Sequence, residues 1–160
     1  MKVEAPRGEP VLVMEREFDA PRDLVWDALT DPAQVAQWYG GHGFENPVCE
    51  MDVRKGGRWT HVMRTPDGAD HPLEFEFLEV KPPERLVWRS AGPAAAAGGP
   101  HSNTMTVTLT AVGARTRWRL VVTFGSEADR KAAQGMGFTE VLGQGCDRLE
   151  AVARRRGVLA

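Results

Sequence analysis

The sequence predicts an α+β fold in which a curved antiparallel sheet of six or seven strands wraps around a long C-terminal helix. Three observations support this prediction. Two short helical segments follow the first strand, within residues 19–39. Apolar and polar residues then alternate with period two through most of the middle of the chain, as in strands with one buried face. Residues 126–155 finally carry an apolar stripe at helical spacing.

The two short helices have recognisable start and stop signals. Asp19 can cap a first helix with Pro21 in its first turn, where a missing backbone N–H costs nothing. The Asp-Pro pair that begins at Asp31 repeats the start signal. Gly40 and Gly41 end the second helix, because glycine enters left-handed conformations without strain. We therefore expect two helices joined by a tight corner.

The strands follow from the alternation of residues after these helices. The residues expected on the inner face are Trp59, His61, Met63, Leu73, Phe75, Phe77, Leu86, Trp88, Met105, Val107, Leu109, Trp118, Leu120, Val122 and Phe124. A turn at residues 65–68 and a Pro-Pro break at 82–83 separate the strands. Residues 92–100, rich in Gly, Ala and Pro, are interpreted as a mobile hairpin connection.

A single helix is predicted over residues 126–155, with Ser126 as its cap. Four glycines interrupt its apolar stripe, at positions 135, 137, 143 and 145. Each costs about 1 kcal/mol relative to alanine in a helix interior, so we expect the first half to bend or to be looser.

Several motifs occur in an order that resembles a known family. These motifs are Ala20-Pro21 with Val25-Trp26, Asp31-Pro32, Trp38, residues 49–59, residues 82–87 and residues 147–149. Their spacing resembles the heat-shock protein 90 ATPase activator homologue family, of the START-like (SRPBCC) helix-grip superfamily. The resemblance covers nearly the whole chain and implies one START-like domain over residues 1–160. Where the family often has a tryptophan and a leucine near the C-terminal motif, this chain has Leu142 and Cys146, and smaller side chains there would enlarge a cavity.

Charge and composition argue against several classes of function. Lys and Arg number 20 against 22 Asp and Glu, so the chain lacks the basic footprint of a nucleic-acid partner. No long apolar run or basic-then-apolar leader is present, and we expect no membrane insertion and a cytoplasmic location. Cys49 and Cys146 have no CxxC spacing and are expected to be ordinary buried thiols. The four histidines show no metal-ligand spacing, so neither a metal nor a cofactor is expected.

No set of residues predicts a catalytic site. His61 is the only histidine on the predicted inner face, where it could orient a ligand or exchange a proton, but we favour a hydrogen-bonded core histidine. Glu74 and Glu76 resemble a carboxylate pair, yet strand alternation directs them to solvent. The serines lack a GxSxG elbow. We assign no catalytic residue.

The aromatic and Met-rich interior is the candidate binding site. An apolar cavity of about 300–1,000 Å³ with a few polar groups is the usual form of a small-molecule site. The candidate lining residues are Trp38, Tyr39, Trp59, His61, Met63, Phe75, Phe77, Trp88, Met105, Trp118, Met136, Phe138 and Leu142. Arg16, Tyr39 and His61 could supply polar contacts. The route into the cavity is expected between residues 136–142 and the loops at 40–41 and 92–100, since glycine clusters lower local stability.

Three classes of function remain. The resemblance implies a module that binds a small hydrophobic or aromatic molecule in this cavity, and the inner-face aromatic residues agree with it. A cyclase, dehydratase or hydrolase of the type found among START-like relatives would use the same cavity with a positioned base. A co-chaperone-like contact with heat-shock protein 90 is the third class, and the chain could also form a homodimer. We favour the binding module.

Overall fold

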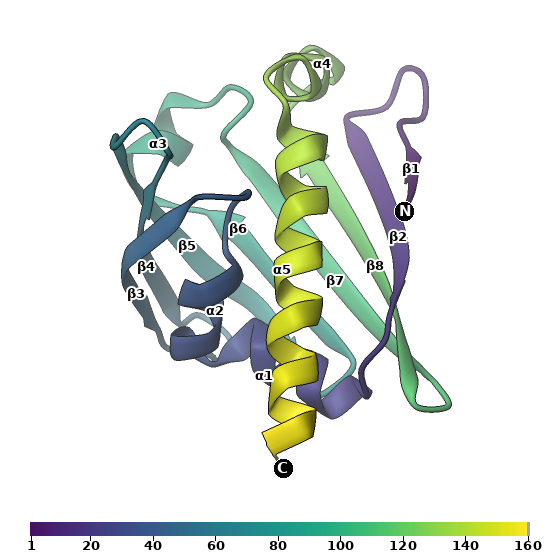
Figure 1. The fold of residues 1–160 in the computed structure, drawn as a ribbon. Coiled ribbons are helices and arrows are strands. Elements are labelled where there is room, and N and C mark those ends of the chain that lie inside the picture. Colours follow the sequence, from purple (N-terminus) through teal and green to yellow (C-terminus); the bar gives the residue numbers. More distant parts are fainter. Residues whose placement is uncertain (160) are drawn as a thin grey trace.

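The computed structural model describes residues 1–159. One antiparallel sheet of eight strands curves around a long C-terminal helix (Figure 1). The strands are β1 (Lys2–Glu4), β2 (Val11–Phe18), β3 (Glu45–Met51), β4 (Arg58–Arg64), β5 (Asp70–Lys81), β6 (Arg85–Ser90), β7 (Asn103–Val112) and β8 (Arg115–Phe124). The helices are α1 (Arg22–Thr30), α2 (Pro32–Trp38), α3 (Gly92–Ala97), α4 (Glu127–Gly135) and α5 (Phe138–Leu159). The predicted fold class is confirmed.

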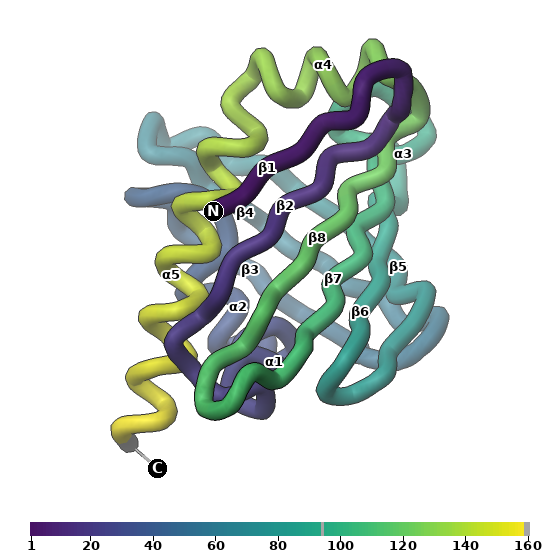
Figure 2. Tube along the Cα trace, turned by 90° about the vertical axis from the view of Figure 1, so that its right-hand side faces the viewer, coloured from purple at the N-terminus to yellow at the C-terminus, as the bar shows by residue number. Residues whose placement is uncertain are grey.

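The sheet order is β1-β2-β8-β7-β6-β5-β4-β3. Because β2 pairs with β8, the start and the end of the sheet-forming sequence lie side by side (Figure 2). The strand beyond the expected seven is β1, a three-residue edge strand exposed along its whole length. Three residues are too few to show a strand period, and neither face of β1 is buried.

The predicted alternation of the strands is confirmed by their register and burial. Trp59 lies opposite Phe75, and Phe77 lies opposite Trp88, all four on the buried face. Glu74 and Glu76 occupy the other face of β5, as expected from the strand period.

The start of α1 differs from the prediction. Pro21 is the N-cap of this helix and makes no side-chain capping bond. Asp19 instead lies before the helix, where its backbone N–H donates to a carboxylate oxygen of Glu150 on α5 at 2.7 Å. The second helix starts as predicted, with Asp31 Oδ1 accepting the backbone N–H of Ala33 at 3.1 Å.

The predicted single C-terminal helix is two helices. Ser126 caps the first as expected, its hydroxyl oxygen accepting the N–H of Asp129 at 3.0 Å. Helix α4 ends at Gly135, and the chain turns at Met136 and Gly137, where Gly137 has a φ of 87°. This left-handed conformation strongly favours glycine, so the pair of glycines ends one helix and begins another. Helix α4 crosses the end of the sheet, and α5 runs along the concave face (Figure 1).

The predicted loop at residues 92–100 contains the short helix α3. Pro93 stands in its first turn, where proline is favoured, and the following alanines are the best helix formers. The alanine-rich composition therefore favours a short helix within this connection, which the prediction of a mobile loop did not include.

Candidate functional site

Most of the predicted site residues meet on the concave side of the sheet. Trp59 is at the centre of this group, with ring centroids of Phe75, Phe77 and Trp88 at 4.6, 6.0 and 5.7 Å. The ring of Tyr39, from the end of α2, meets Trp59 edge-on at 5.6 Å. Such aromatic pairs stabilise a fold beyond the area they bury. The centre of the predicted site is therefore a packed aromatic floor, with each of its sheet residues at most 7% exposed.

Two predicted residues lie apart from this group. Trp118 is buried further along the sheet, where its ring faces Phe18 at 5.8 Å. Met136 occupies the corner between α4 and α5 and is 61% exposed. The sequence could not distinguish Met136 from an interior residue, because the corner was expected to be continuous helix.

Several apolar residues of α2, of the inner face of the sheet and of the first turns of α5 are only partly buried. They are Trp38, Tyr39, Met63, Leu73, Met105, Phe138 and Leu142. At the other end of the helix, Leu109, Leu120 and Leu149 are each at most 2% exposed. Leu73 lies opposite the buried His61, and the ring of Phe138 is 5.7 Å from that of Phe124. We call this half-buried group the apolar mouth.

Both ring nitrogens of His61 are hydrogen-bonded to neighbouring side chains. Its Nδ1 accepts the indole N–H of Trp59 at 3.1 Å, so the ring proton lies on Nε2. Nε2 donates to Asn46 Oδ1 at 2.7 Å. The ring of Tyr39 lies 4.4 Å away. This arrangement leaves no free lone pair on His61 for taking a proton from a ligand.

Asn46 is a site residue that the sequence analysis missed. Its amide donates to the carbonyls of Ala36 and Tyr39, both at 3.0 Å, and its carbonyl oxygen accepts from His61. It thereby connects β3 and β4 to the end of α2. The register of β3 shifts between Glu45 and Val48, so the period of the strand could not show which way Asn46 points.

The titratable groups around the aromatic floor are uncharged near neutral pH. Burial lowers the pKa of His61 to about 4. Burial likewise raises the pKa of the Cys49 thiol to about 11 and that of the Tyr39 hydroxyl above its usual value. Since none of the three changes charge near pH 7, they offer hydrogen bonds and ring faces rather than proton transfer.

Arg16, a predicted polar contact for a ligand, is instead paired with acidic residues of α5. Its guanidinium lies 2.8 Å from a carboxylate oxygen of Asp147 and 3.4 Å from one of Glu150. It also lies over the ring of Phe18, 5.0 Å from the ring centroid. Its role in the structure is to join β2 to the helix.

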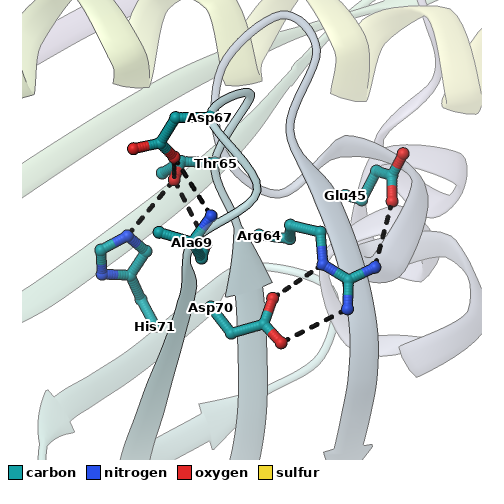
Figure 3. Close-up of polar contacts among 7 residues, drawn as sticks. All are labelled: Glu45, Arg64, Thr65, Asp67, Ala69, Asp70 and His71. Carbon is teal, nitrogen blue, oxygen red and sulfur yellow. Dashed lines mark hydrogen bonds and ion pairs between the residues drawn. The ribbon is translucent and has the colours of Figure 1, made fainter.

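A second group of ionisable side chains occurs at the β4–β5 hairpin (Figure 3). Arg64 holds Asp70 through two hydrogen bonds of 2.7 and 3.3 Å. Thr65 lies between Asp67 and His71, and its hydroxyl donates to Asp67. The hydrogen bond from Thr65 lowers the pKa of Asp67. The group is largely solvent-exposed, and its contacts close the turn.

Neither a metal site nor a membrane span is found in the described part of the chain. Among residues 1–159, no three His, Cys, Asp or Glu side chains gather as a metal site would require. Over the same residues, every helix is too short or too polar to cross a membrane.

Comparisons with known proteins identify relatives of this fold. The family model described as activator of Hsp90 ATPase homolog 1-like protein matches residues 19–154. A crystal structure from Nitrosomonas europaea superimposes with a TM-score of 0.84 at 28% identity, covering 92% of this chain and 96% of that chain. A solution structure from Arthrobacter aurescens gives 0.86 at 24% identity, covering 96% and 91%. A crystal structure from Mycobacterium smegmatis gives a TM-score of 0.84 at 24% identity, covering 98% of both chains. The search of curated proteins gave no match.

Proposed function

The chain belongs to the activator of Hsp90 ATPase homolog 1-like family, and from this premise we propose that it binds a small hydrophobic or aromatic molecule between the sheet and α5. The observation that supports this most directly is the apolar mouth. Apolar side chains on the inner face of a sheet are normally covered, and here Leu73 and Met105 of the sheet and Leu142 of α5 are only partly buried beside a fully packed floor.

The proposed ligand lies against this mouth with one end on the aromatic floor. Met63 and Met105 are unbranched and adapt to different ligand shapes. Phe138 and Leu142 contribute from α5, one turn apart. Transfer of an apolar molecule from water to this surface provides the binding energy, at roughly 25 cal/mol per Å² buried.

A binding role is favoured over catalysis by the state of His61. A general base must be within reach of the proton that it takes and must have a free lone pair. Both ring nitrogens of His61 are hydrogen-bonded to protein groups, and burial lowers its pKa to about 4. In the proposed role, His61 and Asn46 keep Tyr39 in place.

The proposal is tested with methionine-methyl NMR on the protein labelled at its methionine methyl groups. Neutral probes such as indole, 2-naphthol and decanol are added up to their solubility limits. We expect saturable shifts of the Met105 and Met63 methyl signals, with the buried Met14 and the exposed Met136 unchanged. Absence of any shift at Met105 across the panel would exclude the proposed site.

A larger side chain at the apolar mouth, with a matched control elsewhere on α5, tests the place of binding. Leu142→Trp adds bulk at the apolar mouth and should weaken binding of the best probe about tenfold or more, because small changes in apolar volume are worth about 1–3 kcal/mol. Val158→Trp adds the same side chain to the same helix at an 87% exposed position and serves as the control. Equal affinities for the two variants would contradict the proposed place of binding.

A further inference from the structure

A groove with a volume of about 600 Å³ lies on the convex face of the sheet, beneath α3. In Figure 2, α5 runs along one side of the sheet, whereas α3 lies at the upper end of the strands, away from α5. The groove residues Arg58, Glu76 and Arg89 alternate along their strands with buried residues of the concave face, so they point away from α5. The groove also has the inner-face residue Phe124 among its lining residues, so it reaches the end of the sheet that borders the apolar mouth, but Met105 and Leu142 of the mouth are not among its lining residues.

Five neighbouring strands contribute one residue each to the floor of the groove. In register across β4, β5, β6, β7 and β8, these residues are Arg58, Glu76, Arg89, Thr104 and Thr123. A row of this kind is set by the sheet, which makes it more rigid than a group of side chains on a loop.

The roof of the groove is α3, with Ala95 and Ala96 among the lining residues. Several hydrogen bonds connect this segment to the sheet and to itself. The N–H of Ala91 donates to the carbonyl of Glu74 at 2.8 Å. The hydroxyl of Ser90 donates to the carbonyl of His101 at 2.9 Å, and that of Ser102 donates to the carbonyl of Ala95 at 3.4 Å. The groove thus combines a polar floor with a small apolar roof.

Two arginines and Glu76 line the floor, and a second carboxylate, that of Glu74, lies beside Gly92 of the roof. Glu76 accepts a hydrogen bond from Arg89 at 3.2 Å and lies 4.0 Å from Arg58. The Glu76 carboxylate therefore stands between two guanidinium groups. Each guanidinium has five N–H donors, and Glu76 uses a small share of them. Arg58 and Arg89 are 62% and 54% exposed, so their remaining donors are accessible from the groove.

We propose that this groove binds a small organic monocarboxylate. Its carboxylate would take the free donors of Arg58 and Arg89, since the guanidinium fork matches a carboxylate in geometry. The apolar part of the ligand would lie against Ala95 and Ala96. A volume of about 600 Å³ is within the usual range for small-molecule sites.

Phenylacetate is the probe, and 2-phenylethanol is its neutral counterpart of similar size. Backbone amide shifts are followed by NMR in the full chain during titration with each. We expect saturable shifts with phenylacetate at residues 91–96 and 102–104, with a dissociation constant on the order of 1 mM. The alcohol should bind at least tenfold more weakly, because it lacks the charge that the arginines recognise.

Single substitutions identify the groups that hold the carboxylate. Arg58→Gln and Arg89→Gln should each weaken phenylacetate binding about tenfold, the effect of losing one charge-assisted hydrogen bond. Arg117→Gln removes an exposed arginine from the same face of β8, outside the groove lining, and should leave binding unchanged. The amide spectrum of each variant shows directly whether it remains folded.

Three results would overturn the proposal. They are equal binding of acid and alcohol, unchanged affinity in both arginine variants, and phenylacetate shifts confined to residues of the apolar mouth such as Met105 and Leu142. Because the groove and the mouth have different reporter residues, failure of this proposal is distinguishable from failure of the proposed concave-face function.

Discussion

At the scale of single residues, the polar groups of the concave face stabilise the fold. His61 has no exposed surface, yet both ring nitrogens are paired, to Trp59 and to Asn46. A buried polar group that is fully hydrogen-bonded costs little, whereas an unpaired one costs about 1–3 kcal/mol. These bonds hold the rings of Trp59 and Tyr39 in one arrangement and define the floor beside the mouth.

The first prediction concerns the pH dependence of stability. The pKa of His61 is about 4 in the folded chain and about 6.5 in an unfolded one. Between these values the unfolded state binds more protons, so the free energy of unfolding falls as the pH is lowered through this range. His61→Gln should flatten the dependence between about pH 6.5 and 5, above the range where most carboxyl groups titrate.

Urea unfolding at several pH values, followed by tryptophan fluorescence, measures this dependence. His71→Gln is the control, because His71 is an exposed histidine of the β4–β5 hairpin. The control should keep the wild-type dependence of the free energy of unfolding on pH. If His61→Gln kept that dependence as well, then another group would be responsible for the loss of stability in acid.

The second prediction concerns Arg148 of α5. Its guanidinium donates to the carbonyls of Gln37 and Gly41 at 2.8 Å each, and to those of Tyr39 and Phe44 at 3.2 Å each. Charge-assisted bonds of this kind satisfy carbonyls in the last turn of α2 and after its end that have no helical partner. Arg148→Met should lower the free energy of unfolding by about 2–3 kcal/mol.

Arg155→Met is the control for Arg148. Arg155 is exposed, lies on the same helix and makes a hydrogen bond of 3.3 Å to the side chain of Gln37. Its loss should change stability by no more than about 0.5 kcal/mol. Chemical denaturation measures the free energy of unfolding of both variants. Equal losses of stability would show that water satisfies the carbonyls around Arg148 at little cost.

At the scale of elements, the glycines of α5 have separate roles. A Cβ added at Gly145 would lie 3.2 Å from the carbonyl oxygen of Gly40, and one at Gly143 would lie 3.1 Å from the terminal methyl of Met1. Gly145 therefore allows a close approach of backbone to helix, whereas Gly143 meets a flexible side chain. The loop at Gly40 and Gly41 is held against the helix through this approach.

The third prediction separates these two glycines. Both changes to alanine improve helix propensity by about 1 kcal/mol. For Gly143→Ala the methyl of Met1 can move, and we expect stability to rise by up to that amount. For Gly145→Ala the backbone of Gly40 must move, and we expect a net loss of about 1 kcal/mol. Thermal unfolding of the two variants measures these changes in stability. A stabilised Gly145→Ala would refute the close-approach argument.

At the scale of the whole molecule, packing is uneven along α5. Leu149, Val152 and Ala153 are at most 3% exposed, whereas Phe138 and Leu142 are half-buried. Helix α4 and the first turns of α5 meet at the corner formed by Gly137. The better-packed end is the part where α5 meets α1.

The fourth prediction follows from this difference. Segments with few buried apolar contacts open locally at lower free energy than packed ones. Amide hydrogen exchange should therefore be faster in residues 127–142 than in residues 146–153. Saturation of the apolar mouth by a probe should slow exchange in the first turns of α5. Equal protection along both segments would contradict the uneven packing.

The sequence determined the fold class, because that class rests on local periodicity. Alternation in the strands placed Trp59, His61 and Phe75 on one face, and that face is buried. The capping residues Asp31 and Ser126 were also identified, since a cap acts within three residues of the chain. The family resemblance, carried by several such motifs in order, was confirmed by the family model.

Tertiary structure decided the features that depend on contacts between distant residues. The partners of His61, the close approach at Gly145 and the pairing of Arg16 with α5 join segments far apart in the chain. The groove beneath α3 depends on the register of five strands, which no local pattern encodes. Periodicity shows which side of an element is buried, but the other residues that meet it there are set by the packing of the whole chain.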